Sequence, residues 1–290
     1  MAAQILDGKS LAAQVRAGVK DKVARLAQRG IRPGLAVILA GEDPASRVYV
    51  RNKVRACEET GVRSSLLEFP SSVSHGDLLN AVARLNVDAA VHGILVQLPL
   101  PKQVDTLRVL DAVSPAKDVD GFHDANLGAL LAGKPGLAPC TPAGVMRLLE
   151  HAAVPLAGRR AVVIGRSNIV GKPLALMLLQ KDATVTICHS KSRNLELLAK
   201  EADVLVAAIG RAKLVGAAMV KPGACVVDVG INRLADGTLA GDVDFHAAKN
   251  VAGWITPVPG GVGPMTIAML LENCLYAAEH ESRRSCELES

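Results

Sequence analysis

The sequence predicts an α/β fold made of two α/β domains, each with a parallel sheet covered by helices. Short aliphatic runs alternate with stretches of helical periodicity along most of the 290 residues. Hydrophobic residues make up 50% of the chain and aromatic residues only 2%, which suits buried parallel strands made of Ala, Val, Leu and Ile. The chain is also long enough for two domains of ordinary size.

The first part of the chain predicts three strands and the helices that alternate with them. The second helix has the best-defined ends, because Asp43 suits its cap, Pro44 its first turn and Gly61 its stop. The elements expected here are helices over residues 9–29, 43–61 and 74–86 and strands over residues 34–41, 64–69 and 91–101.

Residues 111–142 are rich in Pro, Gly and Asp and are too irregular for a simple strand–helix unit, so we expect a long functional loop or a linker. After it the alternation resumes. The expected helices begin near residues 141, 170, 193 and 266, and the expected strands cover residues 159–165, 183–188, 203–210, 224–230 and 253–258. The last helix, over residues 266–282, is amphipathic and is expected to pack back on the first domain. We therefore predict a first domain of residues 1–142 and 265–290, and a Rossmann-type domain of residues 143–264.

Composition excludes several classes of function. The net charge of +5 is mild, no basic block occurs, and few aromatic side chains exist to stack on bases, so we expect no nucleic-acid partner. The six cysteines lack metal-ligand spacing, and we expect no metal site; Cys188 and Cys225 lie in strand-like runs and should be buried. Without a leader or a run of 18 apolar residues, the sequence predicts a cytoplasmic protein that does not enter a membrane.

A candidate nucleotide site lies at residues 162–173, VVIGRSNIVGKP, where a strand turns into a helix. Helix N-terminal amides attract phosphate, and dinucleotide-binding folds place a glycine-rich loop at this point. Gly165 fits the first position of the GxGxxG pattern, but Ser167 replaces the second glycine and Gly171 comes one residue late. The position between a strand and a helix therefore favours a nucleotide site, although the sequence does not match the GxGxxG pattern. A tight turn without a ligand stays an alternative.

The end of the next strand favours NADP over NAD. NAD-binding folds usually carry a carboxylate there for the ribose hydroxyls, and a carboxylate would repel a 2′-phosphate. Residues 186–194, TICHSKSRN, contain none. Hydroxyl and basic groups, which bind phosphate, stand there instead, and Arg166 in the glycine turn could reach the same place.

Five longer motifs follow one another along the chain: EDPASRVYVRNK, GILVQLPLP, KDVDGFH, GRSNIVGKP and ITPVPGGVGPMT. With these motifs in this order, the chain resembles the bifunctional methylenetetrahydrofolate dehydrogenase/methenyltetrahydrofolate cyclohydrolase family (the FolD family) from about residue 5 to 280. The resemblance implies two α/β domains with a cleft between them, NADP on the second domain, tetrahydrofolate derivatives as substrates and a homodimer. In that reaction methylenetetrahydrofolate is oxidised to the methenyl cation, which is hydrolysed to 10-formyltetrahydrofolate.

The resemblance also implies the site residues. For catalysis and folate binding it implies Tyr49, Lys53, Gln97 and Asp120, with Pro259, Gly260, Gly261, Val262 and Gly263 lining the same site. For NADP it implies Gly165, Arg166, Ser167, Ser190 and Ile231. The turn with Ser167 is the usual form in this family.

Chemistry suggests a role for each of the four catalytic candidates. Lys53 is the natural acid–base group for the hydrolysis, and Tyr49, four residues earlier on the same helical face, can position it or stack on the folate. Gln97 can hold the amine without an ion pair. Asp120 can accept two hydrogen bonds from the pterin.

A structural role stays open for each of them. Tyr49 and Lys53 alone would more often be an exposed helix face. Gln97 can be a polar residue at a strand end, and Asp120 a turn-capping carboxylate, although Asp118 suits that role better.

Two histidines and one loop have simpler interpretations. His92 is expected to be a satisfied core residue, whereas His123 has no partner that the sequence identifies. The glycines of residues 257–266 suit close approach to a ligand or a plain hinge between domains.

Two other functions remain possible, a dehydrogenase without cyclohydrolase activity and a non-catalytic NADP-binding protein. An intact Lys53 argues against the first, and the second would have no need of Lys53, Gln97 and Asp120 together. A short-chain dehydrogenase also has a YxxxK pair, but the order of the motifs along the chain excludes this class. In short-chain dehydrogenases the pair follows the glycine-rich loop, whereas in this sequence Tyr49 and Lys53 precede Gly165.

Overall fold

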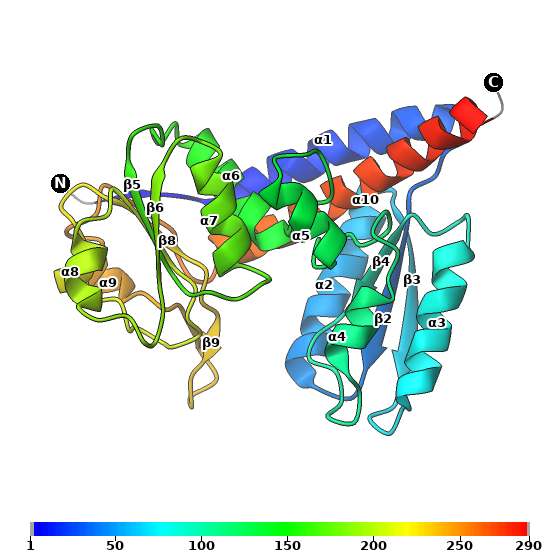
Figure 1. Ribbon diagram of the computed structural model, residues 1–290, viewed down its shortest axis with the longest axis horizontal. Helices are drawn as coiled ribbons and strands as arrows, with labels where there is room; N and C mark the ends of the chain where they lie inside the picture. The colour runs from blue at the N-terminus through cyan, green and yellow to red at the C-terminus, as the bar shows by residue number, and fades with distance from the viewer. Residues whose placement is uncertain (1–2, 289–290) are drawn as a thin grey trace. The chain divides into compact units, whose positions relative to one another are not determined.

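The computed structural model describes residues 3–288, and side chains up to residue 281 (Figure 1). The chain forms two compact units, each with its own parallel sheet. The three-strand unit contains residues 13–140 and 267–290, and the six-strand unit contains residues 1–12 and 141–266. The predicted α/β fold with two parallel-sheet domains is confirmed.

The sheet of the three-strand unit has the order β3-β2-β4, with all strands parallel. Its central strand is buried along its whole length, and Figure 1 shows α2 and α3 on either side of the sheet. Ile38 and Ile94 pack with Leu78 of α3 in a fully buried aliphatic cluster. The elements are β2 (Gly34–Ala40), α2 (Pro44–Thr60), β3 (Arg63–Phe69), α3 (His75–Val87), β4 (Gly93–Val96), α4 (Thr106–Asp111) and α5 (Asp124–Leu131).

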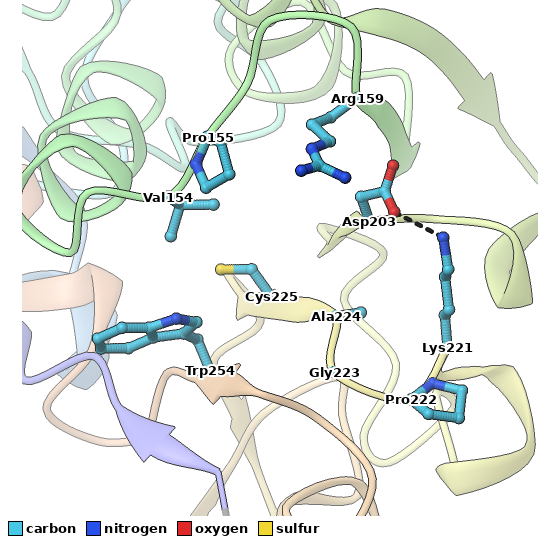
Figure 2. A pocket seen from close by; sticks show the side chains of 10 residues that line it. All are labelled: Val154, Pro155, Arg159, Asp203, Lys221, Pro222, Gly223, Ala224, Cys225 and Trp254. Atoms are coloured by element: carbon cyan, nitrogen blue, oxygen red, sulfur yellow. Dashed lines mark hydrogen bonds and ion pairs between the residues drawn. The ribbon is translucent and has the colours of Figure 1, made fainter.

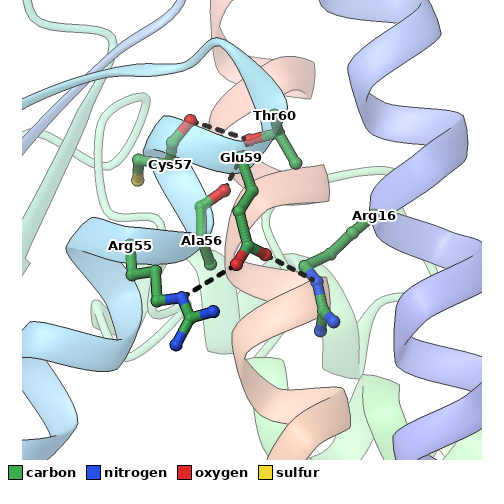
Figure 3. A network of polar contacts seen from close by, with 6 residues as sticks. All are labelled: Arg16, Arg55, Ala56, Cys57, Glu59 and Thr60. Carbon is green, nitrogen blue, oxygen red and sulfur yellow. Dashed lines mark hydrogen bonds and ion pairs between the residues drawn. The ribbon is translucent and has the colours of Figure 1, made fainter.

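Helix α2, which carries two of the catalytic candidates, is fixed at both ends. The Asp43 carboxylate accepts a hydrogen bond from the Ser46 amide at 2.7 Å, and Gly61 ends the helix with a φ of 79°. Near its C-terminus the Glu59 carboxylate lies between Arg55, at 3.0 Å, and Arg16 of α1 (Gly8–Gln28), at 3.8 Å (Figure 3). These contacts link α2 to the helix beside it.

The sheet of the six-strand unit has the order β1-β11-β8-β7-β5-β6, again with every pair parallel. The strand order reverses at β5, whose neighbours are β6 and β7, and ligands of such sheets bind at the carboxyl ends near that point. Figure 1 shows α8 and α9 on one side of the sheet and α7 on the other. The strands are β1 (Gln4–Ile5), β5 (Arg160–Ile164), β6 (Thr184–Cys188), β7 (Val204–Ala207), β8 (Cys225–Asp228) and β11 (Trp254–Ile255), and the helices include α7 (Gly171–Leu179), α8 (Leu195–Lys200) and α9 (Phe245–Ala248).

The structure differs from the predicted domain limits at the start of the chain. Residues 1–12 belong to the six-strand unit, because Gln4 and Ile5 pair with Trp254 and Ile255 as an edge strand. The strand has only two residues, both exposed, so the sequence offers no periodicity to detect it. The other limits differ by two residues each, since the six-strand unit resumes at residue 141 and ends at residue 266.

Several predicted elements have different lengths in the structure. The strand expected over 91–101 is limited to Gly93–Val96, because Pro99 and Pro101 cannot donate to a ladder. The irregular segment at 111–142 contains α5, and α6 begins within it (Cys140–His151). Helix α10 (Val262–Leu288) begins four residues earlier than Thr266.

Short elements that no sequence pattern predicted are α4, α9, the 3-10 helix η1 (Ala217–Met219) and the antiparallel pair β9 (Asn232–Arg233) and β10 (Leu239–Ala240). Cys188 and Cys225 are buried, as predicted. None of the helices in the described residues combines the length and the apolar character that crossing a membrane requires.

Candidate active site

Lys53 and Gln97 contact each other inside the three-strand unit. Lys53 lies on α2, and Gln97 follows β4 directly. The lysine Nζ donates to Gln97 Oε1 at 3.1 Å, and Gln97 Nε2 donates to the Leu98 carbonyl at 2.8 Å. The backbone amide of Gln97 donates to the Ile38 carbonyl at 2.9 Å, so the glutamine is held at three atoms. The structure therefore brings together two residues that are 44 positions apart.

The amine of Lys53 has an uncharged partner. Among the residues whose side chains are described, no carboxylate lies within ion-pair distance of it. Lys53 is half-buried, whereas Tyr49, one turn earlier on α2, is 37% exposed. Both side chains come from the same face of one helix.

Asp120 lies in the segment between α4 and α5 and is half-buried. Burial raises the pKa of its carboxyl to about 6; the positive charge of Lys53 opposes this rise and the negative charge of Asp118 adds to it. Lys53 and Asp120 are thus close enough to interact electrostatically. The Asp120 carboxylate makes no hydrogen bond to the described residues, so its acceptor positions are not used by any of them.

Asp118 has the structural role that the sequence left open for Asp120. It is buried, and its Oδ2 accepts from the His123 amide at 2.8 Å and from Asn126 Nδ2 at 2.9 Å. The imidazole of His123 also has a partner, because its Nδ1 accepts from the Ala125 amide at 3.0 Å and caps α5. The segment that carries Asp120 is therefore fixed by its neighbours.

His92 is a core residue, as predicted. It is 9% exposed, and its Nδ1 accepts from the Gly34 amide at 3.1 Å. Burial lowers the pKa of the imidazole, which keeps the ring neutral as that hydrogen bond requires.

The predicted nucleotide turn joins β5 to α7 in the six-strand unit. Gly165 has a φ of 134°, and a Cβ at this position would collide with the carbonyl of Ala208. A Cβ at Gly171 would collide with the carbonyl of Gly165. Ser167 Oγ accepts from the amides of Val170 at 3.2 Å and of Gly171 at 3.3 Å. The serine hydroxyl thus holds the two amides at the start of the helix, which explains how the turn forms without the second glycine of the general pattern.

The carboxyl ends of neighbouring strands carry the other nucleotide candidates. Arg166 follows β5 and Ser190 follows β6, and both are exposed. Ile231, after β8, is 44% exposed. The residues after β6 contain no carboxylate, so this edge offers a guanidinium and hydroxyl groups, the donor set that suits the 2′-phosphate of NADP.

Two buried carboxylates shape this edge, and the sequence analysis missed both. Asp242 is 0% exposed and accepts from three successive amides, those of Ile209 at 2.6 Å, Gly210 at 2.9 Å and Arg211 at 2.8 Å. Asn232 Nδ2 donates to the same carboxylate at 2.9 Å. Asp242 therefore links the segment that follows β7 to Asn232, the residue after Ile231.

The second carboxylate, Asp228, interlocks with the first. Its oxygens accept from the amides of Gly230, Asp242 and Val243, each at 2.9 Å. A Cβ at Gly230 would collide with Asp242, and one at Gly241 would collide with Asp228. The glycines near the two aspartates, in DVG (228–230) and GD (241–242), are the signal that could have indicated this arrangement. No group of three or more His, Cys, Asp or Glu side chains in the described residues is arranged to hold a metal ion.

A separate cavity of about 230 Å³ lies at the opposite edge of the same sheet (Figure 2). Asp203, Ala224 and Trp254, at the amino ends of β7, β8 and β11, contribute to its wall. Lys221 donates to the Asp203 carboxylate at 2.6 Å. None of the predicted site residues lines this cavity, so it is distinct from the nucleotide edge.

The glycine-rich loop at residues 259–263 belongs to the six-strand unit, whereas Tyr49, Lys53, Gln97 and Asp120 belong to the other unit. Gly260 has a φ of 110°, and its carbonyl accepts from the Lys9 amide at 2.9 Å. Val262 is buried at the first position of α10. The loop is thus held by the first turn of α1.

Two family models match the chain. The catalytic domain of tetrahydrofolate dehydrogenase/cyclohydrolase matches residues 6–120, and the NAD(P)-binding domain of the same family matches residues 139–282. The chain belongs to the tetrahydrofolate dehydrogenase/cyclohydrolase family. Both halves of the molecule are therefore accounted for by one family, as the five motifs indicated.

Relatives of the family are similar over their whole length. "Bifunctional protein FolD" from Polaromonas naphthalenivorans is 60% identical over 279 residues, which are 96% of this chain and 99% of the relative. The crystal structure of bifunctional FolD from Campylobacter jejuni has 48% identity and a TM-score of 0.95, covering 97% of this chain and 100% of that one. The Trypanosoma brucei enzyme, solved with NADP cofactor and an inhibitor, has 39% identity and a TM-score of 0.95, covering 98% and 99%.

Proposed function

We propose that Lys53 is the acid–base residue of a folate site in which both reactions of this enzyme take place. The enzyme is a methylenetetrahydrofolate dehydrogenase and methenyltetrahydrofolate cyclohydrolase, and its cofactor is NADP. It oxidises 5,10-methylenetetrahydrofolate and hydrolyses the 5,10-methenyl product to 10-formyltetrahydrofolate. The match to a bifunctional family argues against the two alternatives, a dehydrogenase without cyclohydrolase activity and a non-catalytic NADP-binding protein.

The observation that carries the proposal for Lys53 is its hydrogen bond to an amide oxygen. Hydrolysis of the methenyl cation needs a group that takes a proton from the attacking water and returns one to a ring nitrogen. Gln97 Oε1 orients the amine at 3.1 Å without adding a counter-charge. Because Gln97 is uncharged, loss of a proton from Lys53 breaks no ion pair with this hydrogen-bond partner.

We also propose that Asp120 binds the pterin. Its two oxygens can accept from the amino group and the ring N–H, which form a bidentate pair of donors. The absence of hydrogen bonds between this carboxylate and the described residues supports the assignment. Tyr49 would cover one face of the ring. For the loop at residues 259–263, a role in folate binding stays a prediction from the resemblance to the family.

The nucleotide edge of the six-strand unit is proposed to hold NADP. When bound, the nicotinamide supplies the hydride acceptor for the dehydrogenase step. Gly165 and Ser167 would bring backbone amides to the diphosphate, and the exposed Arg166 and Ser190 would bind the 2′-phosphate. Ile231 would pack beside the nicotinamide end, on the segment that Asp242 fixes.

The substitution Arg166→Ala tests the 2′-phosphate assignment. It is expected to weaken NADP⁺ by about 1–3 kcal/mol, the scale of a lost charged hydrogen bond, and to leave NAD⁺ nearly unchanged. KM values for the two nucleotides at saturating folate give the measurement. Arg159→Ala, which removes an exposed arginine from the opposite edge of the same sheet, is the matched control. Equal losses for both nucleotides would show that Arg166 does not contact the 2′-phosphate.

The substitution Gln97→Glu tests the need for an uncharged partner. A carboxylate at hydrogen-bond distance favours the ammonium form of Lys53, so hydrolysis of the methenyl substrate is expected to slow. Gln28→Glu, at an exposed position of α1, makes the same chemical change away from the site. A Gln97→Glu enzyme that hydrolyses as fast as this control would contradict the proposal.

The first direct experiment is a spectrophotometric assay. Methylenetetrahydrofolate is supplied with NADP⁺ or NAD⁺, and the later decay of methenyl absorbance reports the hydrolysis. We also propose that two identical chains form a dimer and that the protein is cytoplasmic. The resemblance to the family supports both proposals.

A further inference from the structure

We propose that Asn273 is a positioning residue of the folate site, because its amide ties the peptide that precedes Asp120 to the segment at Ala138, which packs against Gly121. This inference rests on the proposed pterin-binding role of Asp120. Asn273 lies on α10, in the part of that helix that belongs to the three-strand unit. Asn273 lies outside the five motifs, in the amphipathic helix that follows the last of them, and no sequence pattern indicated a role for it in the site.

Both hydrogens of the Asn273 side-chain amide are used in hydrogen bonds to backbone carbonyls. Its Nδ2 donates to the Val119 carbonyl at 2.8 Å and to the Ala138 carbonyl at 2.8 Å. It also lies 3.5 Å from the Cys140 sulfur. An amide nitrogen has two hydrogens, and each of the two carbonyls takes one. Val119 is the residue immediately before Asp120, so one of these bonds acts at the peptide next to the carboxylate.

The two segments also pack tightly against each other. A Cβ at Gly121 would collide with the backbone of Ala138 and Pro139, and Gly121 has a φ of 73°. The Cys140 thiol donates to the same Val119 carbonyl at 3.1 Å. Asp120 therefore lies at a turn whose backbone packs closely against Ala138 and Pro139, and Asn273 bridges the two segments.

The helix side of this bridge is rigid. Leu270 and Cys274, on either side of Asn273, are 1% and 0% exposed. After Asp120, the chain is held to the residues before it, because the His123 amide and Asn126 Nδ2 both donate to the Asp118 carboxylate. Asn126 also donates to the Pro115 carbonyl at 2.9 Å. Asp120 itself has no such bond, so its direction is set by the backbone that these residues fix.

The electrostatics of the bridge favour an amide at position 273. The carbonyls of Val119 and Ala138 both point their negative ends at it, and an amide nitrogen satisfies them without adding charge. Burial raises the pKa of the Cys140 thiol, so the sulfur stays uncharged beside Asp120. A carboxylate at position 273 would repel both carbonyls and Asp120.

The variant Asn273→Ser tests the proposal by removing both carbonyl bonds. The KM for methylenetetrahydrofolate is expected to rise about tenfold, the scale of a lost pair of hydrogen bonds, while the KM for NADP⁺ stays within about twofold. Asn86→Ser is the matched control, since Asn86 also bridges two backbone groups of this unit, the Ala112 carbonyl and the Ser114 amide, each at 2.8 Å. It should lower the melting temperature to a similar degree without raising the folate KM.

Two further variants keep the test independent of folding. Asn273→Gln retains the amide on a longer chain and is expected to raise the folate KM by a smaller factor than serine does. Asn273→Asp is expected to shift the acid limb of the folate pH profile to higher pH, because a new negative charge next to Asp120 disfavours its ionisation. A purely structural asparagine would not move that limb.

Each outcome has a definite meaning. A folate KM that is unchanged in folded Asn273→Ser and Asn273→Gln, or that rises equally in Asn86→Ser, overturns the positioning role. If Asp120→Ala raises the folate KM while the Asn273 variants do not, only this inference fails. If Asp120→Ala also leaves the folate KM unchanged, the pterin assignment fails and the inference fails with it.

Discussion

Replacing Lys53 by methionine is expected to abolish the hydrolysis of methenyltetrahydrofolate while the protein stays folded. Methionine has a similar length and can fill the half-buried position, but it carries no group that exchanges protons. Loss of a general acid–base group typically costs roughly 10²–10⁴ in rate. The decay of methenyl absorbance after addition of the isolated methenyl substrate measures this step alone.

The matched control is Lys22→Met, which makes the same replacement at an exposed position of α1. Its rate of hydrolysis should equal that of the parent enzyme. A Lys53→Met enzyme with near-normal turnover would remove the lysine from the mechanism and leave the proton transfers to water or to another group.

Asp120→Ala is expected to raise the KM for methylenetetrahydrofolate strongly without changing the affinity for NADP⁺. Hydrogen bonds to a charged group contribute about 1.5–3 kcal/mol each, so the loss of even one bond of the bidentate pair corresponds to a factor of about ten or more. Initial rates at several folate concentrations, with NADP⁺ saturating, give the measurement. An unchanged folate response would refute the pterin assignment.

The raised pKa of Asp120 adds a pH dependence to the same prediction. Because that pKa is about 6, the carboxyl becomes protonated as the pH falls through 6 and loses acceptor capacity. Folate KM in the parent enzyme should therefore rise below pH 6 and be level above it. Asp120→Asn cannot titrate, so its folate KM should lack this rise.

The same residue should reduce stability at neutral pH. A carboxyl whose pKa is higher in the folded state than in the unfolded chain stabilises the fold below its unfolded value near 4, and this contribution is lost as the pH rises through about 6. Asp120→Asn should thus unfold at a higher denaturant concentration than the parent at pH 7, and the difference should shrink at pH 4. An active-site group that lowers stability is a common cost of function.

Local signals in the sequence predicted the element that carries Lys53 and Tyr49. Both ends of α2 follow from neighbouring residues, the cap at Asp43 and the left-handed glycine at Gly61, and the structure has both. The hydrogen bond from Lys53 to Gln97 joins residues from different elements, so only the motif order of a family could indicate it.

Other parts of the site depend on contacts that no local pattern encodes. Asp228 and Asp242 accept from backbone amides, which every residue type offers, so their partners have no sequence signature. Asn273 bridges two carbonyls for the same reason. Strand β1 was missed because its partner lies about 250 residues away and its two residues are exposed.

The pairing of β1 with β11 bears on the order in which the chain can be assembled on the ribosome. The edge strand is synthesised long before its partner, so Gln4 and Ile5 must wait for Trp254 and Ile255 before they gain hydrogen-bonding partners. The three-strand unit likewise lacks its portion of α10 until residue 267 and beyond have emerged. A nascent chain interrupted near residue 140 therefore contains neither unit whole, and early termination products should be cleared by proteases rather than persist as separate domains.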